Sequence, residues 1–218
     1  MTNRLLILLL ISLFWGQTLR AEVQINSYRK RYSWKPEWSN AIREEILSGS
    51  KKDENILSME IDEEDLEDLE CVGYNKASIE DKTDFWIVFF SALTRAESGF
   101  NEKVMSPKSR GHRSFGLLQL AKQTAKSKCD ITPSESNVLN GADNLRCGVK
   151  LMTWQLLGAP TSAGKKLRSD LEGQIFGKYI FQWGPLRQND HRGRKLLVDW
   201  FKSHLDQLKF CDQKTKSQ

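Results

Sequence analysis

One long apolar stripe constrains this chain more than any other feature of its sequence. Between residues 85 and 96 the apolar side chains recur at helical spacing, namely Phe85, Trp86, Val88, Phe89, Ala92, Leu93 and Ala96. Ser78 with Asp81 three positions later is typical of a helix start, and Gly99 ends the pattern. A helix with so broad an apolar face has to be buried. The sequence therefore predicts a core helix that other helices cover.

The rest of the chain continues the helical pattern on both sides of this stripe. Apolar residues at helical spacing predict further helices over residues 36–47, 62–71, 117–128, 142–157, 167–181 and 192–208. Residues 99–115 are rich in Ser, Gly and basic side chains without clean alternation, so they predict a loop. The sequence shows no internal repeat. We expect a helix-dominated domain with one long loop after its first core helix.

The N-terminus has the features of a secretory signal. Arg4 supplies a positive charge, residues 5–14 form an apolar run, and Ala21 offers a small residue for cleavage. The run of about ten residues is shorter than the roughly 20 that a spanning helix needs. Because Leu19 stands where a small residue is usual, an uncleaved anchor remains an alternative. We expect an exported protein, periplasmic or secreted, with no later membrane span.

Charge is divided unevenly along the chain. Residues 53–70 contain ten acidic side chains and no basic one, whereas residues 71–218 contain 24 Lys and Arg against 14 Asp and Glu. A basic exported domain suits an anionic polymer such as a cell wall, a nucleic acid or a membrane surface, although the same charge also serves ordinary solubility. The acidic run is interpreted as a solvated face or linker, or as a segment that folds against the basic domain and modulates it.

Four cysteines lie in the part of the chain that would be exported: Cys71, Cys129, Cys147 and Cys211. An even number in an oxidising compartment favours two disulfides, for which three pairings exist. Cys129–Cys147 would close a short loop, and Cys71–Cys211 would join the two ends of the basic domain. Zinc binding is the alternative, but the chain has no C-x-x-C pair and its three His residues are scattered. We therefore expect no metal and no cofactor.

Glu97 is the candidate catalytic residue, because it stands at the end of the apolar stripe. An apolar, partly dry setting raises the pKa of a carboxyl group, which keeps its proton available near neutral pH. Gly111 and Gly116 allow the backbone after it to fold back across the carboxyl group. No Asp–His pair surrounds Ser98 in the sequence, so serine hydrolysis is not expected.

Several spaced motifs extend from Glu97 towards the C-terminus. In chain order they are Glu97-Ser98-Gly99-Phe100-Asn101, Gly116-Leu117-Leu118-Gln119-Leu120, Thr124-Ala125, Asn144-Leu145-Arg146-Cys147-Gly148 and Phe181-Gln182-Trp183-Gly184-Pro185. Together they resemble the lysozyme-like soluble lytic transglycosylase (SLT) family, over roughly residues 71–187. The resemblance implies an α+β, predominantly α-helical, lysozyme-like fold with a short N-terminal extension.

The resemblance also implies a set of substrate-binding positions around Glu97. They are Ser98, Phe115, Gly116, Gln119, Tyr179 and Phe181. Gly116 would let the backbone approach a sugar ring, and Gln119 would hold an acetamido group or orient Glu97. Phe115 and Trp183 would stack on sugar faces, or equally lie in the core. The family usually has Tyr where this chain has Phe181, and Tyr179 is the nearest hydroxyl that could replace it.

The resemblance implies cleavage of the β-1,4 bond between MurNAc and GlcNAc in peptidoglycan. Glycoside hydrolysis commonly uses two carboxyl groups, but residues 103–128 contain no Asp or Glu. A single carboxyl fits the lytic transglycosylase route, in which Glu97 is first acid and then base and a 1,6-anhydro product forms. A hydrolytic lysozyme and a non-catalytic wall-binding protein remain alternatives.

We expect the partners of the protein to be glycan strands rather than nucleic acid, and the protein to be a monomer. The sequence divides into a signal peptide over residues 1–21, an N-terminal extension with the acidic run over residues 22–70, a catalytic domain over residues 71–211 and a polar tail over residues 212–218.

Overall fold

The structure is a computed structural model of the chain. It describes residues 22–26, 32–49, 55–107, 113–129, 138–158, 171–178 and 182–212. In these parts the helices and strands follow in the order α1 (Pro36–Gly49), α2 (Glu63–Asp68), η1 (Tyr74–Lys76), α3 (Ile79–Glu97), β1 (Ser114–Phe115), β2 (Leu120–Ala121), α4 (Lys122–Cys129), α6 (Gly141–Leu156), η3 (Gly184–Leu186), α7 (His191–Lys202), η4 (Leu205–Gln207) and η5 (Lys209–Asp212). The fold is predominantly helical, as the sequence predicted.

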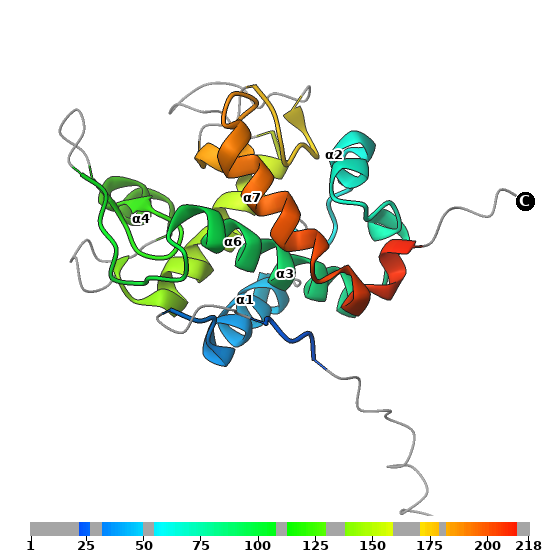
Figure 1. Ribbon diagram of the computed structural model, residues 1–218, viewed down its shortest axis with the longest axis horizontal. Helices are drawn as coiled ribbons and strands as arrows, with labels where there is room; N and C mark the ends of the chain where they lie inside the picture. Colours follow the sequence, from blue (N-terminus) through cyan, green and yellow to red (C-terminus); the bar gives the residue numbers. More distant parts are fainter. Residues whose placement is uncertain are drawn as a thin grey trace, which may run out of the picture.

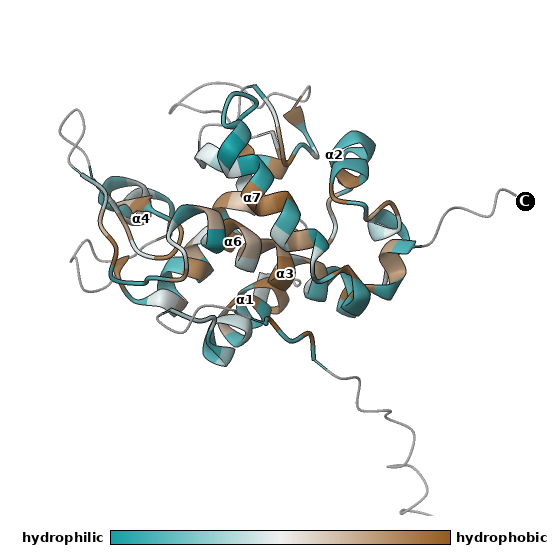
Figure 2. Cartoon of the chain, in the orientation of Figure 1, coloured by the Kyte–Doolittle hydropathy of each residue, from teal (hydrophilic) through white to brown (hydrophobic). Residues whose placement is uncertain are grey.

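Helix α3 forms the centre of the molecule, with α7 and α1 packed against it (Figure 1). Every residue from Thr83 to Thr94 is buried, so the helix is covered on all sides along this stretch. Ser78 caps its start by accepting the N–H of Asp81, which confirms the capping pattern. Apolar colouring lies where α3 and α7 meet (Figure 2), and the ring of Phe85 packs edge-on against Phe201 of α7 at 5.1 Å.

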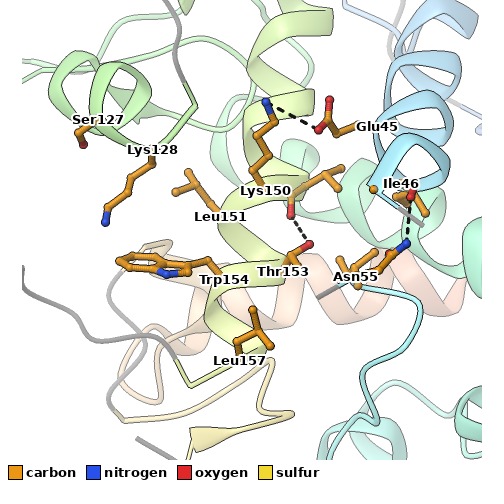
Figure 3. Close-up of a pocket in the computed structure, with 13 residues that line it drawn as sticks. Glu45, Ile46, Asn55, Ser127, Lys128, Lys150, Leu151, Thr153, Trp154 and Leu157 are labelled. Carbon is orange, nitrogen blue, oxygen red and sulfur yellow. Dashed lines mark hydrogen bonds and ion pairs between the residues drawn. The ribbon is translucent and has the colours of Figure 1, made fainter. Parts of the chain in front are cut away.

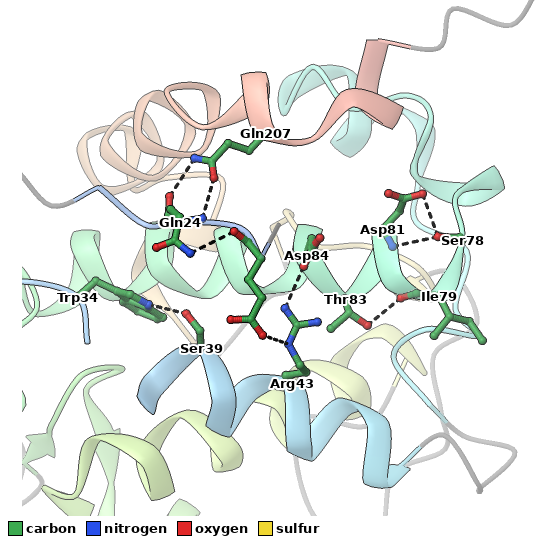
Figure 4. Close-up of polar contacts among 11 residues, drawn as sticks. Gln24, Trp34, Ser39, Arg43, Ser78, Ile79, Asp81, Thr83, Asp84 and Gln207 are labelled. Atoms are coloured by element: carbon green, nitrogen blue, oxygen red, sulfur yellow. Dashed lines mark hydrogen bonds and ion pairs between the residues drawn. The ribbon is translucent and has the colours of Figure 1, made fainter. Parts of the chain in front are cut away.

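The N-terminal part of the described chain shares this core rather than standing apart from it. Helix α1 confirms the helix predicted over residues 36–47, and it packs on α6 as well as on α3. Trp38 and Ile42 of α1 belong to the same cluster of buried apolar residues as α3. Arg43 donates to the buried Asp84 of α3 at 3.1 Å (Figure 4). The extension is therefore anchored to the core by both apolar and charged contacts.

Two of the predicted helices were wrong in part. Residues 117–121 form a turn and the strand β2, and α4 begins only at Lys122. The reason is backbone geometry, since Gly116 and Gln119 have positive φ angles of 75° and 47°. Strand β2 instead pairs antiparallel with β1. The helix predicted over residues 167–181 is absent from its described part, residues 171–178, which contain turns and the positive-φ Gly173.

Two disulfides join the four cysteines, Cys71 to Cys211 and Cys129 to Cys147. The first ties the segment after α2 to the last described turn of the chain. The second holds the end of α4 against α6. Both pairs agree with an oxidising compartment. In the described residues, no helix combines the length and the apolar character needed to cross a bilayer.

Candidate active site

Glu97 is the last residue of α3, and the local backbone fixes where the helix stops. The N–H of Ser98 donates to the carbonyl of Thr94 at 3.0 Å, and its hydroxyl donates to the same oxygen at 3.1 Å. Gly99 and Phe100 then take positive φ angles of 60° and 68°, which turn the chain away. Ser98 thus caps and orients the helix end, and its contact with substrate stays a prediction.

Phe100 secures this turn from the other side. Its side chain is 3% exposed and packs edge-on against Trp34 at 5.9 Å and Trp200 at 5.3 Å. An L-residue at positive φ is strained, so burial of a large ring is needed to hold it there. Glu102, the next carboxyl group, forms an ion pair with Lys35 at 3.0 Å. This pairing leaves Glu97 as the acid at the helix end.

The surroundings of Glu97 raise its pKa from its usual 4.5 to about 7. Burial is the larger cause, because it disfavours the charged form, and the negative charge of Asp190 adds to it. The positive charge of Arg187 and a hydrogen bond from the backbone N–H of Gly184 act in the opposite direction. At neutral pH the carboxyl group is therefore poised between its acid and its base form. The predicted apolar setting is confirmed in this respect.

The groups that tune Glu97 come from one short stretch of chain. The 3-10 turn η3 closes with the N–H of Arg187 donating to the carbonyl of Gly184 at 2.9 Å. Asp190 follows as the N-cap of α7, and its Oδ1 accepts the N–H of Gly193 at 2.9 Å. A Cβ atom on Gly184 would lie 2.8 Å from Oδ2 of Asp190. A larger residue at position 184 would therefore displace the Asp190 carboxylate.

Asp190 is the charged neighbour of Glu97 that sequence reasoning missed. The expectation was that Glu97 has no second carboxyl group near it, and the charge of Asp190 is close enough to raise the pKa of Glu97. The two residues are far apart in sequence and come together only because α7 packs on α3. The sequence offered one local signal, because Asp190 is of a residue type that favours the N-cap position of a helix. It marks a helix start, but it does not reveal which groups that helix end faces.

Gly116 and Asn144 build the turn between β1 and β2. The side chain of Asn144, fully buried in α6, donates to the carbonyls of Phe115 and Val138 and accepts the N–H of Leu118 at 2.9 Å. A Cβ atom on Gly116 would lie 2.6 Å from Asn144 Nδ2. The close approach observed at Gly116 is thus to the core. An approach to a sugar ring remains a prediction.

The side chains of Gln119 and Trp183 donate hydrogen bonds to the backbone of the same turn, which Phe115 precedes. Nε2 of Gln119 donates to the carbonyl of Gly116 at 2.9 Å. Phe115 is 3% exposed, and Trp183 is 1% exposed with its Nε1 donating to the carbonyl of Leu118 at 3.0 Å. Of the two roles considered for these rings, sugar stacking or core, the structure favours the core. Contact of Phe115 with substrate stays a prediction.

Two of the predicted substrate-binding residues, Tyr179 and Phe181, lie outside the described residues, and so does Gly111. Among the described residues, no group of three or more His, Cys, Asp or Glu side chains is arranged to hold a metal ion.

A cavity of about 660 Å³ lies between α1, α4 and α6, and Glu97 is not among its lining residues (Figure 3). Lys128 of α4 stands over the ring of Trp154 of α6 at 3.7 Å to the centroid. On the α1 side, Lys150 reaches Glu45 at 3.8 Å. Glu97 therefore does not belong to this hollow, and the chemistry is assigned from Glu97 and its partners.

The fold and this site define a lysozyme-like domain, predominantly helical, with an acidic residue at the end of its central helix. Residues 76–167 match the family model described as the transglycosylase SLT domain. This confirms the resemblance that the motifs indicated.

Solved structures support the same fold. A glutamate-to-glutamine mutant of Bd0314 DslA has a TM-score of 0.63 and 19% sequence identity, covering 88% of this chain and 100% of that chain. A second form of wild-type Bd0314 DslA has a TM-score of 0.56 and 20% identity, covering 77% and 88%. At such identities the likeness concerns the fold alone. No curated protein sequence matches the chain.

Proposed function

We propose that this protein is an exported enzyme that cleaves the β-1,4 bond between MurNAc and GlcNAc in peptidoglycan glycan strands, with Glu97 as its acid and base. The observation that carries the proposal is the pKa of about 7 at Glu97, at the end of the central helix of an SLT domain. A carboxyl group with this pKa can give up a proton and take one back at neutral pH.

The reaction proceeds in two steps. The Glu97 carboxyl donates its proton to the bridging oxygen, which leaves as the 4-hydroxyl of GlcNAc while the bond to C1 of MurNAc breaks. The Glu97 carboxylate then accepts the proton of the C6 hydroxyl of MurNAc as that oxygen bonds to C1, which closes the 1,6-anhydro ring. The N–H of Gly184 and the charge of Arg187 stabilise the carboxylate between the steps. No water is consumed, and Glu97 ends protonated as it began.

Hydrolysis of the same bond is the second candidate, and Asp190 is the observation that favours it. Hydrolytic glycosidases use two carboxyl groups, and Asp190 supplies a second charge near Glu97. However, one oxygen of Asp190 is engaged as the cap of α7. We therefore favour the single-acid route, with Asp190 acting on Glu97 through its charge.

The replacement Glu97→Gln tests the role of the acid, with Glu102→Gln as the matched control. Loss of an acid–base group lowers rates by about 10²–10⁴-fold, so we expect Glu97→Gln to release almost no muropeptides from purified sacculi. Glu102 is engaged in an ion pair with Lys35 and does not act on the pKa of Glu97, so its variant should retain activity. Circular dichroism verifies the fold of both. Substantial muropeptide release by a folded Glu97→Gln protein would rule out Glu97 as the acid, and binding without clearing by the wild type would indicate a wall-binding protein.

A further inference from the structure

The acidic segment before the family match makes close backbone contacts with the loop of residues 171–178. Asp65 of α2 is 6% exposed, and its Oδ2 accepts the N–H of Ile175 at 2.6 Å and the N–H of Phe176 at 3.1 Å. The N–H of Asp62 donates to the carbonyl of Gly173 at 3.2 Å. Figure 1 shows α2 beside this loop. A buried carboxylate that accepts two backbone N–H groups makes strong, charge-assisted hydrogen bonds.

The same loop continues towards Glu97. The N–H of Gly177 donates to the carbonyl of Leu186 at 3.0 Å, and the N–H of Gln188 donates to the carbonyl of Gly177 at 3.2 Å. Leu186 belongs to the turn η3, which begins at Gly184. The N–H of Gly184 is the group that hydrogen-bonds the Glu97 carboxylate. A continuous series of hydrogen bonds and short chain segments thus connects Asp65 with the catalytic acid.

Helix α2 is itself fastened to α7, which carries Asp190 at its start. Asp68 forms an ion pair with Arg194 of α7, and the Arg194 guanidinium lies over the ring of Phe176 at 4.0 Å. Glu70 pairs with Lys202 at 2.6 Å. The acidic segment therefore contacts the loop of residues 171–178 and helix α7, which lie on either side in sequence of the stretch that tunes Glu97.

We propose that Asp65 is a positioning residue of the active site, which holds residues 175–177 so that the turn η3 presents the N–H of Gly184 to Glu97. This inference rests on the proposed function. It implies that the acidic segment is required for activity and does not inhibit the catalytic domain. The geometry explains why an acidic run tolerates a buried member. Burial raises the pKa of Asp65 to about 6, and the two backbone N–H groups oppose that rise, so its carboxylate form prevails at neutral pH.

The test compares Asp65→Ala and Asp65→Asn with Glu64→Ala, an exposed residue of the same helix. Loss of the anchor should displace Gly184 and lower kcat by about 10- to 100-fold, the effect of small misplacements in catalytic sites. Because the Gly184 hydrogen bond lowers the pKa of Glu97, its loss should also move the alkaline limb of the kcat/KM profile to higher pH. A purely structural role would lower the melting temperature without moving that limb.

Other charged side chains also affect the pKa values of Glu97 and Asp65, and they have to be the same in every variant that is compared. Asp190 and Arg187 act on Glu97, while Asp62 and Arg194 act on Asp65. None of them is changed in the three variants. Asp65→Asn keeps a neutral acceptor, so it should move the limb in the same direction by a smaller amount. This variant keeps the test decisive where Asp65→Ala fails to fold.

Titration of the Glu97 carboxyl by carbon-13 NMR separates this proposal from the proposed function. In both Asp65 variants the pKa of Glu97 should rise relative to the wild type, whether or not the protein cleaves glycan. An inactive wild type would overturn the proposed function, and the titration would still decide the positioning role. An unchanged Glu97 pKa together with unchanged kcat in folded variants would overturn the proposal. Increased activity in Asp65→Ala would also overturn it, because the segment would then be inhibitory.

Discussion

Replacement of Asp190 by Asn isolates one of the forces that set the pKa of Glu97. Asn is as good an N-cap as Asp, so the variant keeps the start of α7 while it removes a negative charge near the acid. Because the cap is retained, the free energy of unfolding should change by less than about 0.5 kcal/mol. Any larger effect on catalysis would then come from electrostatics.

The size of the effect follows from the pKa of Glu97. A pKa of about 7 instead of 4.5 corresponds to roughly 3 kcal/mol of interaction that favours the protonated form. At pH 7 it leaves about half of the enzyme with the acid form, compared with less than about 1% at the usual value. Burial is the larger cause and the charge of Asp190 the second. Asp190→Asn should therefore recover only part of this difference, about half to one pH unit.

The assay is the pH dependence of kcat/KM on soluble glycan strands. The alkaline limb reports ionisation of the acid in the free enzyme, and in Asp190→Asn it should move to lower pH. Asp199→Asn is the matched control, because it removes the same charge from an exposed position of the same helix, where Asp199 pairs with Lys195. A limb that stays in place in Asp190→Asn, or moves equally in Asp199→Asn, would refute the assignment of Asp190.

Three further outcomes are expected. Gly116→Ala should lose about 2 kcal/mol of unfolding free energy or more, because of its positive φ and the contact with Asn144, whereas Gly49→Ala should be tolerated in denaturant titrations. Replacing Cys71 and Cys211 by Ser should destabilise the protein by about 5 kcal/mol in the chain-entropy model; alkylation of all four thiols without reduction would contradict both disulfides. The pKa of Glu97 is higher in the folded protein than in the unfolded chain, so the free energy of unfolding of the wild type should decrease as the pH rises from 4.5 to 7. Glu97→Gln should not show this decrease, and above pH 7 it should be more stable than the wild type by up to about 3 kcal/mol.

The core helix could be predicted from sequence because its signals are local. The cap at Ser78 and the apolar stripe up to Ala96 lie within one stretch of chain, and they suffice for a buried helix that ends at Glu97. The same holds for α1 and α6.

Other elements could not be predicted because distant residues decide them. Apolar spacing favoured a helix through Ile175 and Phe176, but their N–H groups are taken by Asp65 and are not available for helical bonds. The turn before α4 depends on Asn144, which accepts the N–H of Leu118 from a later helix. Asp190 reaches Glu97 only through the packing of α7. In each case a tertiary contact outweighed the local pattern.

Digestion of purified sacculi in oxygen-18-labelled water, followed by mass spectrometry of the released muropeptides, tests the central claim most directly. If Glu97 serves as both acid and base without a water molecule, the wild-type protein should release 1,6-anhydro products that carry no label, and Glu97→Gln should release almost none. Reducing ends that carry oxygen-18 would contradict this account and would identify a hydrolase in which the second carboxyl group, Asp190, has to be reconsidered.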